Sequence, residues 1–345
     1  MEQYVTSYCK TLDPIYLEKL RKYKNELVEI CRQEKKAKGK PRRFYAITDL
    51  VINHFTKTIP RYEYLSGTSG IYYMTNGTKK IYLIGDIHNT IGECTSDKEP
   101  IRVNDWIHNI LDTSDVFIDF FLEIDENNPG FLSKAKYATN IQRDIEIIKW
   151  FGKRPDTLSK SIAEHYNCFK LNDKRCIYNN ARIHFSDIRR YILEIYQNTR
   201  YKTDLTDDQL FEYLMSSPRI ASQYNHVPEH IRDKIISFIK LVYNTPNDNP
   251  YYAWVMDLYL LLRLFRTFDK GSLPRTIDNS IIYTGHSHIL YYIIFLESIG
   301  FTIKQEFSNT PITRNIKEIL DEKIQFPNSN LQCINISKLS YPLFG

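Results

Sequence analysis

Two short segments of the chain share a pattern of a glycine followed three residues later by a histidine. The first is Gly85 to His88 (GDIH) and the second is Gly285 to His288 (GHSH). Each follows a run of β-branched and aromatic residues that predicts a buried strand. Since the carboxyl ends of strands are where sites form in open α/β sheets, we expect the two segments to meet at one site.

The side chains in these segments are of the kinds that bind metal ions. On an extended backbone, alternate side chains share a face, so Asp86 would point the same way as His88, and His286 the same way as His288. Such a set of carboxylate and imidazole groups suits a divalent transition metal such as Mn, Co or Zn. Glu123, near the end of another apolar run, would be a fifth ligand or the base that deprotonates a metal-bound water.

Glu123 lies between Leu122 and Ile124, where a buried carboxylate needs a metal, an arginine or a histidine beside it. A structural ion pair is the alternative to a functional role. His184 and Arg189 belong to a polar cluster in the segment ARIHFSDIR. Arg189 would orient substrate or stabilise developing charge, and the alternative for this cluster is a salt-bridged loop.

The apolar helix predicted at Tyr251 to Phe268 contains Asp257 and Arg263. We interpret these two residues as a buried structural pair. The alternative is that Asp257 and Arg263 contact the side chains of the site and support them from outside it.

The elements that must position these residues alternate between strand and helix. Asn76-Gly77 is a strong turn signal and predicts a hairpin over Ile71 to Leu83. Later elements are predicted from their hydrophobic periodicity and their Gly and Pro boundaries. They are a helix at 103–111, strands at 115–124, 181–189 and 280–284, a helix at 289–298 and a strand at 301–306.

This order predicts an α/β fold with a mixed, partly parallel sheet flanked by helices. We expect a helical, basic N-terminal extension over residues 1–70 and an α/β domain over residues 71–345. A mostly helical insertion is expected within that domain at about residues 132–276.

Composition and charge bound the class of protein. The net charge is only +5, and a basic run at Lys35 to Arg43 is the one candidate contact for nucleic acid or an anionic surface. A solvated helix end is the alternative for that run.

The 6 cysteines form no CxxC pair, so we expect reduced thiols. With no signal peptide and no apolar stretch long enough to span a bilayer, we expect a cytoplasmic or otherwise intracellular protein, with a virion as the other location.

The chain resembles the TraB/Tiki superfamily, which is grouped with the erythromycin-esterase-like proteins. The resemblance rests on Gly85 to His88, on Glu123 in the run FFLEIDENNPG and on Gly285 to His288, and it covers roughly residues 79–306. It implies a hydrolase that cleaves an amide or ester bond of a peptide or small molecule. Either a metal ion held by these residues supplies the hydroxide, or a histidine oriented by Glu123 acts as a base without metal.

In the hydrolase hypothesis His88 and Glu123 are catalytic residues, and Arg189 or His184 stabilises the oxyanion. A competing resemblance is to the calcineurin-like metallophosphoesterases, whose first motif is Asp-x-His and whose last is Gly-His-x-His. Their intermediate Gly-Asp-x-x-Asp and Gly-Asn-His motifs are absent here. A third hypothesis is a scaffold or virion protein that keeps the fold without catalysis.

Overall fold

The computed structural model describes about half of the chain. The described residues are 62–87, 94, 100–125, 180–189, 207–243, 253–268, 274–309, 312, 332–341 and 343–344. The predicted N-terminal helices, the basic run Lys35 to Arg43 and His88 lie outside these ranges.

A six-stranded sheet forms the centre of the described structure, in the order β6-β5-β7-β3-β2-β8. The first four strands of this order are parallel to one another, whereas β2 runs antiparallel to both β3 and β8. The prediction of a mixed, partly parallel sheet is therefore confirmed. The strands are β2 (Gly70–Thr75), β3 (Lys80–Asp86), β5 (Ile118–Asp125), β6 (Ala181–Asp187), β7 (Asn279–Gly285) and β8 (Thr302–Ser308).

The predicted hairpin joins β2 to β3. Gly77 takes a φ of 94°, a conformation that suits glycine because it has no Cβ. The side chain of Asn76 accepts hydrogen bonds from the backbone amides of Thr78 and Lys79. These contacts fix the turn and set the register in which β3 delivers Gly85 and Asp86 to the carboxyl edge of the sheet.

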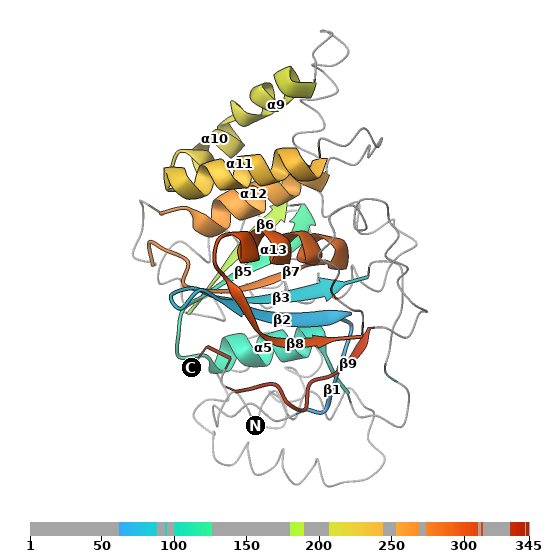
Figure 1. The fold of residues 1–345 in the computed structure, drawn as a ribbon. Coiled ribbons are helices and arrows are strands. Elements are labelled where there is room, and N and C mark those ends of the chain that lie inside the picture. Colours follow the sequence, from blue (N-terminus) through green and yellow to red (C-terminus); the bar gives the residue numbers. More distant parts are fainter. Residues whose placement is uncertain are drawn as a thin grey trace, which may run out of the picture.

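Helices cover both faces of the sheet. Figure 1 shows α13 lying over one face and α5 under the other. Four of the described helices, α9 to α12, lie within residues 132–276, the range predicted to be a mostly helical insertion. The described helices are α5 (Val103–Thr113), α9 (Asp207–Met215), α10 (Pro218–Tyr224), α11 (Glu229–Tyr243), α12 (Ala253–Phe265) and α13 (His286–Ser298).

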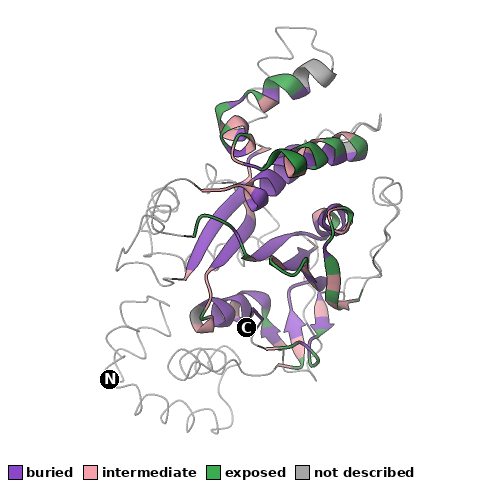
Figure 2. Ribbon diagram, turned by 60° about the vertical axis from the view of Figure 1, so that its left-hand side comes forward, coloured by how far each residue is buried: buried purple, intermediate pink, exposed green. Residues whose placement is uncertain are grey.

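Alternation along the strands divides the core into two clusters. In β3, Ile81 and Leu83 belong to the cluster that contains residues of α11, α12 and α13, whereas Tyr82 and Ile84 belong to the cluster that contains residues of α5. Figure 2 shows that the central strands are buried on both sides and that the outer face of α11 is exposed. Burial of each such side chain contributes about 1.5–3 kcal/mol to the free energy of folding. This burial stabilises the sheet on which the strand ends depend.

A second, three-stranded sheet of order β4-β1-β9 lies beside the first, and the sequence patterns do not predict it. It consists of β1 (Tyr64–Ser66), β4 (Pro100–Arg102) and β9 (Cys333–Asn335). Because β1 falls within residues 62–70, this part of the predicted N-terminal extension is not helical. Among the described helices, none has the length and apolar character needed to cross a membrane.

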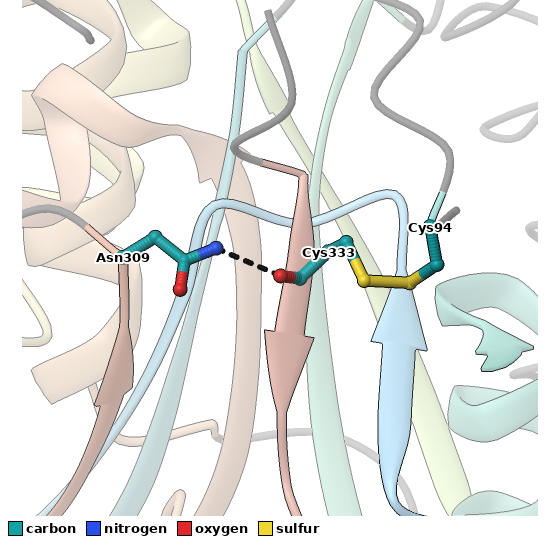
Figure 3. Close-up of a disulfide and its surroundings, with 3 residues drawn as sticks. All are labelled: Cys94, Asn309 and Cys333. Atoms are coloured by element: carbon teal, nitrogen blue, oxygen red, sulfur yellow. Dashed lines mark hydrogen bonds between the residues drawn. A yellow bond between two sulfur atoms is a disulfide. The ribbon is translucent and has the colours of Figure 1, made fainter. Parts of the chain in front are cut away.

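A disulfide joins Cys94 to Cys333 at the start of β9, with the two Cα atoms 5.0 Å apart (Figure 3). The expectation of reduced thiols is therefore wrong for this pair. Sequence spacing could not show the pairing, because the two cysteines are 239 residues apart and meet only in the folded chain. The side chain of Asn309, just after β8, donates a hydrogen bond to the carbonyl of Cys333 (Figure 3).

Candidate functional site

Three neighbouring parallel strands bring Glu123, Arg189 and His288 together at their carboxyl ends. Glu123 lies near the end of β5, Arg189 follows β6, and His288 follows β7. The Oε1 atom of Glu123 lies 3.0 Å from Nη2 of Arg189 and 3.8 Å from Nε2 of His288. The sequence predicts a site at this edge of the sheet, and three of the predicted residues meet there.

The second Gly-x-x-His segment changes from strand to helix at its glycine. Gly285 is the N-cap residue of α13, and its backbone N–H donates to Oε2 of Glu123 at 2.7 Å. A carboxylate at a helix N-terminus is stabilised by the amides of the first turn and by the helix dipole. Glu123 thus has both an amide and a guanidinium as partners, as its position in an apolar strand requires.

Asp257 of α12 orients the imidazole of His288. Its Oδ1 atom lies 2.7 Å from Nδ1 of His288 and accepts a second hydrogen bond, of 2.6 Å, from the hydroxyl of Tyr292. Since a carboxylate only accepts, Nδ1 of His288 carries the proton and Nε2 is directed toward Glu123. Asp257 itself is 1% exposed, so solvent screens its charge only weakly and the attraction between the carboxylate and the ring is strong.

The charge state of His288 follows from its two carboxylate neighbours. Burial alone would lower the pKa of His288, but the negative charges of Asp257 and Glu123 outweigh burial and the repulsion from Arg189. The pKa of His288 therefore lies above its ordinary value. The ring therefore holds a proton more tightly than a free histidine does, and a histidine can act as both acid and base.

Arg189 is held in place by Asp187. Its Nε and Nη2 atoms bond to the two oxygens of that carboxylate, each at 2.9 Å, and Nη2 also bonds to Glu123. A quarter of the Arg189 side chain is exposed. Arg189 and Asp187 thus form a charged pair at the sheet edge, and part of the Arg189 side chain remains exposed.

His286 does not share a face with His288, contrary to the expectation from an extended backbone. The helix begins at His286, and two residues along a helix differ in direction by more than half a turn. The Nδ1 atom of His286 lies 2.7 Å from the hydroxyl of Ser69, and burial lowers the pKa of His286 to about 4. A Cβ at Gly85 would lie only 2.6 Å from that same nitrogen.

Asp86 is buried at the end of β3, where its register partner is Gly285. Within the part of the chain that the structure describes, no three His, Cys, Asp or Glu side chains are placed to hold a metal ion. The predicted ligand set of Asp86, His88, Glu123, His286 and His288 has four described members, and the metal site stays a prediction. His88 lies outside the described residues.

His184 belongs to a different network and is not brought to Glu123. Its Nε2 atom lies 2.7 Å from Asp119, and its Nδ1 atom accepts a 2.6 Å hydrogen bond from Nε of Arg263. Burial and the neighbouring Arg263 lower the pKa of His184 to about 3. The hypothesis that His184 stabilises an oxyanion at this site has no support in the geometry.

Asp257 and Arg263 are not a structural pair. Asp257 bonds to His288 and Tyr292, whereas Arg263 bonds to His184 and Gln223. The alternative interpretation, that Asp257 supports the site from behind, agrees with the structure. The spacing of His288 and Tyr292 on one helix face could have indicated a shared partner, but nothing in the sequence identifies that partner as Asp257.

Comparison of the chain with protein-family models, with curated proteins and with solved structures finds no match.

Proposed function

We propose that the protein is a hydrolase that cleaves an ester or amide bond with a histidine base at the carboxyl edge of the sheet. The observation that carries the proposal is the arrangement of His288 between the carboxylates of Asp257 and Glu123. One carboxylate fixes the tautomer, and the other nitrogen is left for chemistry, as in histidine-based hydrolytic sites generally.

The 3.8 Å separation between Nε2 of His288 and Oε1 of Glu123 is too long for a direct hydrogen bond. The Nε2 atom can therefore bond to a water molecule or a substrate. In the proposed reaction, Nε2 takes a proton from water while the oxygen attacks the carbonyl carbon. Asp257 stabilises the imidazolium that forms, and His288 then returns the proton to the leaving group.

Negative charge that develops on the carbonyl oxygen needs a nearby donor. Arg189 is the cation that the described residues place at this edge, and its guanidinium is both fixed by Asp187 and partly exposed. A preorganised charge of this kind stabilises a transition state more than a mobile one, because no reorganisation is needed during the reaction. We assign oxyanion stabilisation to Arg189.

The metal-dependent version of the hypothesis requires a donor beyond the described residues. Glu123 and His288 are ligands of suitable type for Mn, Co or Zn, but Arg189 bonds to the same Oε1 atom that faces His288. A cation there would have to displace that guanidinium. His88 is the candidate that would complete such a set, and elemental analysis of the purified protein tests this version separately.

The order of the motifs also supports the proposal. A Gly-x-x-His segment, a glutamate at a strand end and a second Gly-x-x-His segment occur in the order typical of the TraB/Tiki superfamily. In the structure, Glu123 and the second segment are in direct contact through Gly285.

The test is hydrolysis of a panel of activated esters and short peptides by the full chain, with and without added Mn²⁺, Co²⁺ or Zn²⁺. His288→Ala and Asp257→Asn should each lower kcat by about 10²-fold or more, the range expected for loss of general base catalysis. His230→Ala, on the exposed side of α11, is the matched control and should retain full activity. Equal rates in wild type and His288→Ala, or no hydrolysis of any substrate, would overturn the proposal.

A further inference from the structure

Three arginines gather around the ring of Phe268 at the other end of the sheet, and we call them the arginine cluster. Their guanidinium carbons lie 3.9 Å (Arg182), 5.5 Å (Arg263) and 4.7 Å (Arg266) from the ring centre. Arg182 is at the amino end of β6, and Arg263 is near the carboxyl end of α12. The cluster is therefore separate from the candidate site at the carboxyl ends of the strands.

Arg263 has only neutral acceptors in the part of the chain that the structure describes. Its Nε atom donates to Nδ1 of His184, and its Nη1 atom donates to Oε1 of Gln223 at 3.1 Å. The same Gln223 oxygen accepts from Nη1 of Arg266 at 2.5 Å. One amide oxygen thus holds two guanidinium groups close together, although their charges repel each other.

Arg182 has one carboxylate partner and one unused donor. Its Nε atom lies 2.5 Å from Asp119, and its Nη1 atom donates to the carbonyl of Pro274 at 3.3 Å. The Nη2 atom is buried and has no hydrogen-bond partner among the described residues, and only 9% of the side chain is exposed. A buried N–H group of a cation without an acceptor is costly and rare in folded proteins.

The neutral surroundings of Arg263 and the unused donor of Arg182 point to a missing anion. We propose that the arginine cluster binds a phosphate group, either inorganic phosphate or the phosphate of a small ligand. A phosphate has oxygens on all sides and a charge near −2, so several guanidinium groups can bond to it from different directions. A carboxylate has only two oxygens and a single charge, so it can bond to fewer guanidinium groups than a phosphate can.

Part of the arginine cluster borders solvent. Arg263, Arg266 and Phe268 are each only partly buried, whereas Asp119 and His184 form the closed floor behind them. The cation–π contacts with Phe268 keep the guanidinium planes in position before the anion arrives. The site is therefore preorganised, which reduces the entropy lost on binding.

The experiment is isothermal titration calorimetry of inorganic phosphate into the full chain at constant ionic strength. Sodium chloride and sodium acetate are titrated in parallel to separate a phosphate site from general screening and from a carboxylate site. The variants are Arg263→Gln and Arg266→Gln. Lys304→Gln is the control, because Lys304 is an exposed cation on β8, away from the cluster.

We expect saturable binding of one phosphate per chain, at least about tenfold weaker in either arginine variant and unchanged in Lys304→Gln. If Arg263→Gln does not fold, the partly exposed Arg266→Gln decides the same question, with far-UV circular dichroism as the check on folding. Three results would overturn the proposal: no heat beyond that of chloride, unchanged affinity in the folded arginine variants, or acetate binding as tight as that of phosphate.

Discussion

The imidazole of His286 lies against Gly85, so the first Gly-x-x-His segment makes room for the second. A Cβ on Gly85 would lie 2.6 Å from Nδ1 of His286 and 3.2 Å from the hydroxyl of Ser69. The glycine is required by this close approach of a ring to the strand. The two segments are thus parts of one packed unit, even though they are distant in sequence.

Gly85→Ala should therefore destabilise the fold by roughly 1–3 kcal/mol, because the added methyl group overpacks a buried contact. Urea unfolding measures the loss. In the double variant with His286→Ala the methyl group has space, so the combined loss should be smaller than the sum of the two single losses. Strictly additive losses would show that the two residues are not in contact.

Much of the fold can be predicted because its signals are local. The Asn76-Gly77 turn and the apolar runs of β3, β5 and β7 all occur where the sequence pattern places them. The three-residue strands β1, β4 and β9 are too short to show a hydrophobic period, and they pair with partners distant in sequence. No single-sequence pattern distinguishes such strands from loop.

The candidate site can be predicted only in part, for a similar reason. Glu123 and His288 follow from their positions at strand ends. The divergence of His286 from His288 depends on where α13 begins, and at that point the amide of Gly285 bonds to Glu123, a residue from another strand. Asp257 lies in an apolar helix that gives no indication of which strand end it will meet.

The protein should lose stability as the pH falls from about 6.5 to about 4. The pKa of His286 is about 4 and that of His184 is about 3, both lowered first of all by burial. In this window the unfolded chain binds protons that the folded chain does not, so each histidine contributes a slope of up to about 1.4 kcal/mol per pH unit. His288 has the opposite sign: its raised pKa stabilises the fold below about pH 6.5, and that contribution is lost as the pH rises through the folded value.

Urea midpoints measured across this range test the assignment. The slope should be smaller in His286→Gln, which has no titrating ring at that position. His230→Gln, on the exposed side of α11, is the control and should leave the slope unchanged. A stability that is constant between about pH 4.5 and 6.5 in the wild type would contradict the buried, neutral state of both rings.

The Cys94–Cys333 disulfide should contribute about 2–4 kcal/mol to the free energy of unfolding, because it closes a long loop of the chain. The double variant Cys94→Ser/Cys333→Ser should unfold at correspondingly lower urea concentration. Reduction of the wild type with a thiol reagent should give the same shift and should have no effect on the double variant. Free-thiol counts that are identical before and after reduction would show that the bridge does not form.

Arg189→Lys separates charge from geometry at the candidate site. Lysine keeps the positive charge but cannot bond to Asp187 and Glu123 with a fixed planar fork. We expect kcat for ester hydrolysis to fall by about 10-fold or more with little change in KM, since the assigned role is at the transition state. A change confined to KM would instead place Arg189 in substrate binding.

The most direct test of the candidate site is the pKa of His288, measured by NMR titration of the wild type and of Asp257→Asn. The resonance is assigned by its absence in His288→Ala. We predict a pKa above the ordinary value of 6.5 in the wild type and a lower pKa in Asp257→Asn, because the carboxylate that holds the ring has been neutralised. An ordinary pKa that does not respond to Asp257→Asn would contradict the Asp257–His288–Glu123 arrangement and the function proposed from it.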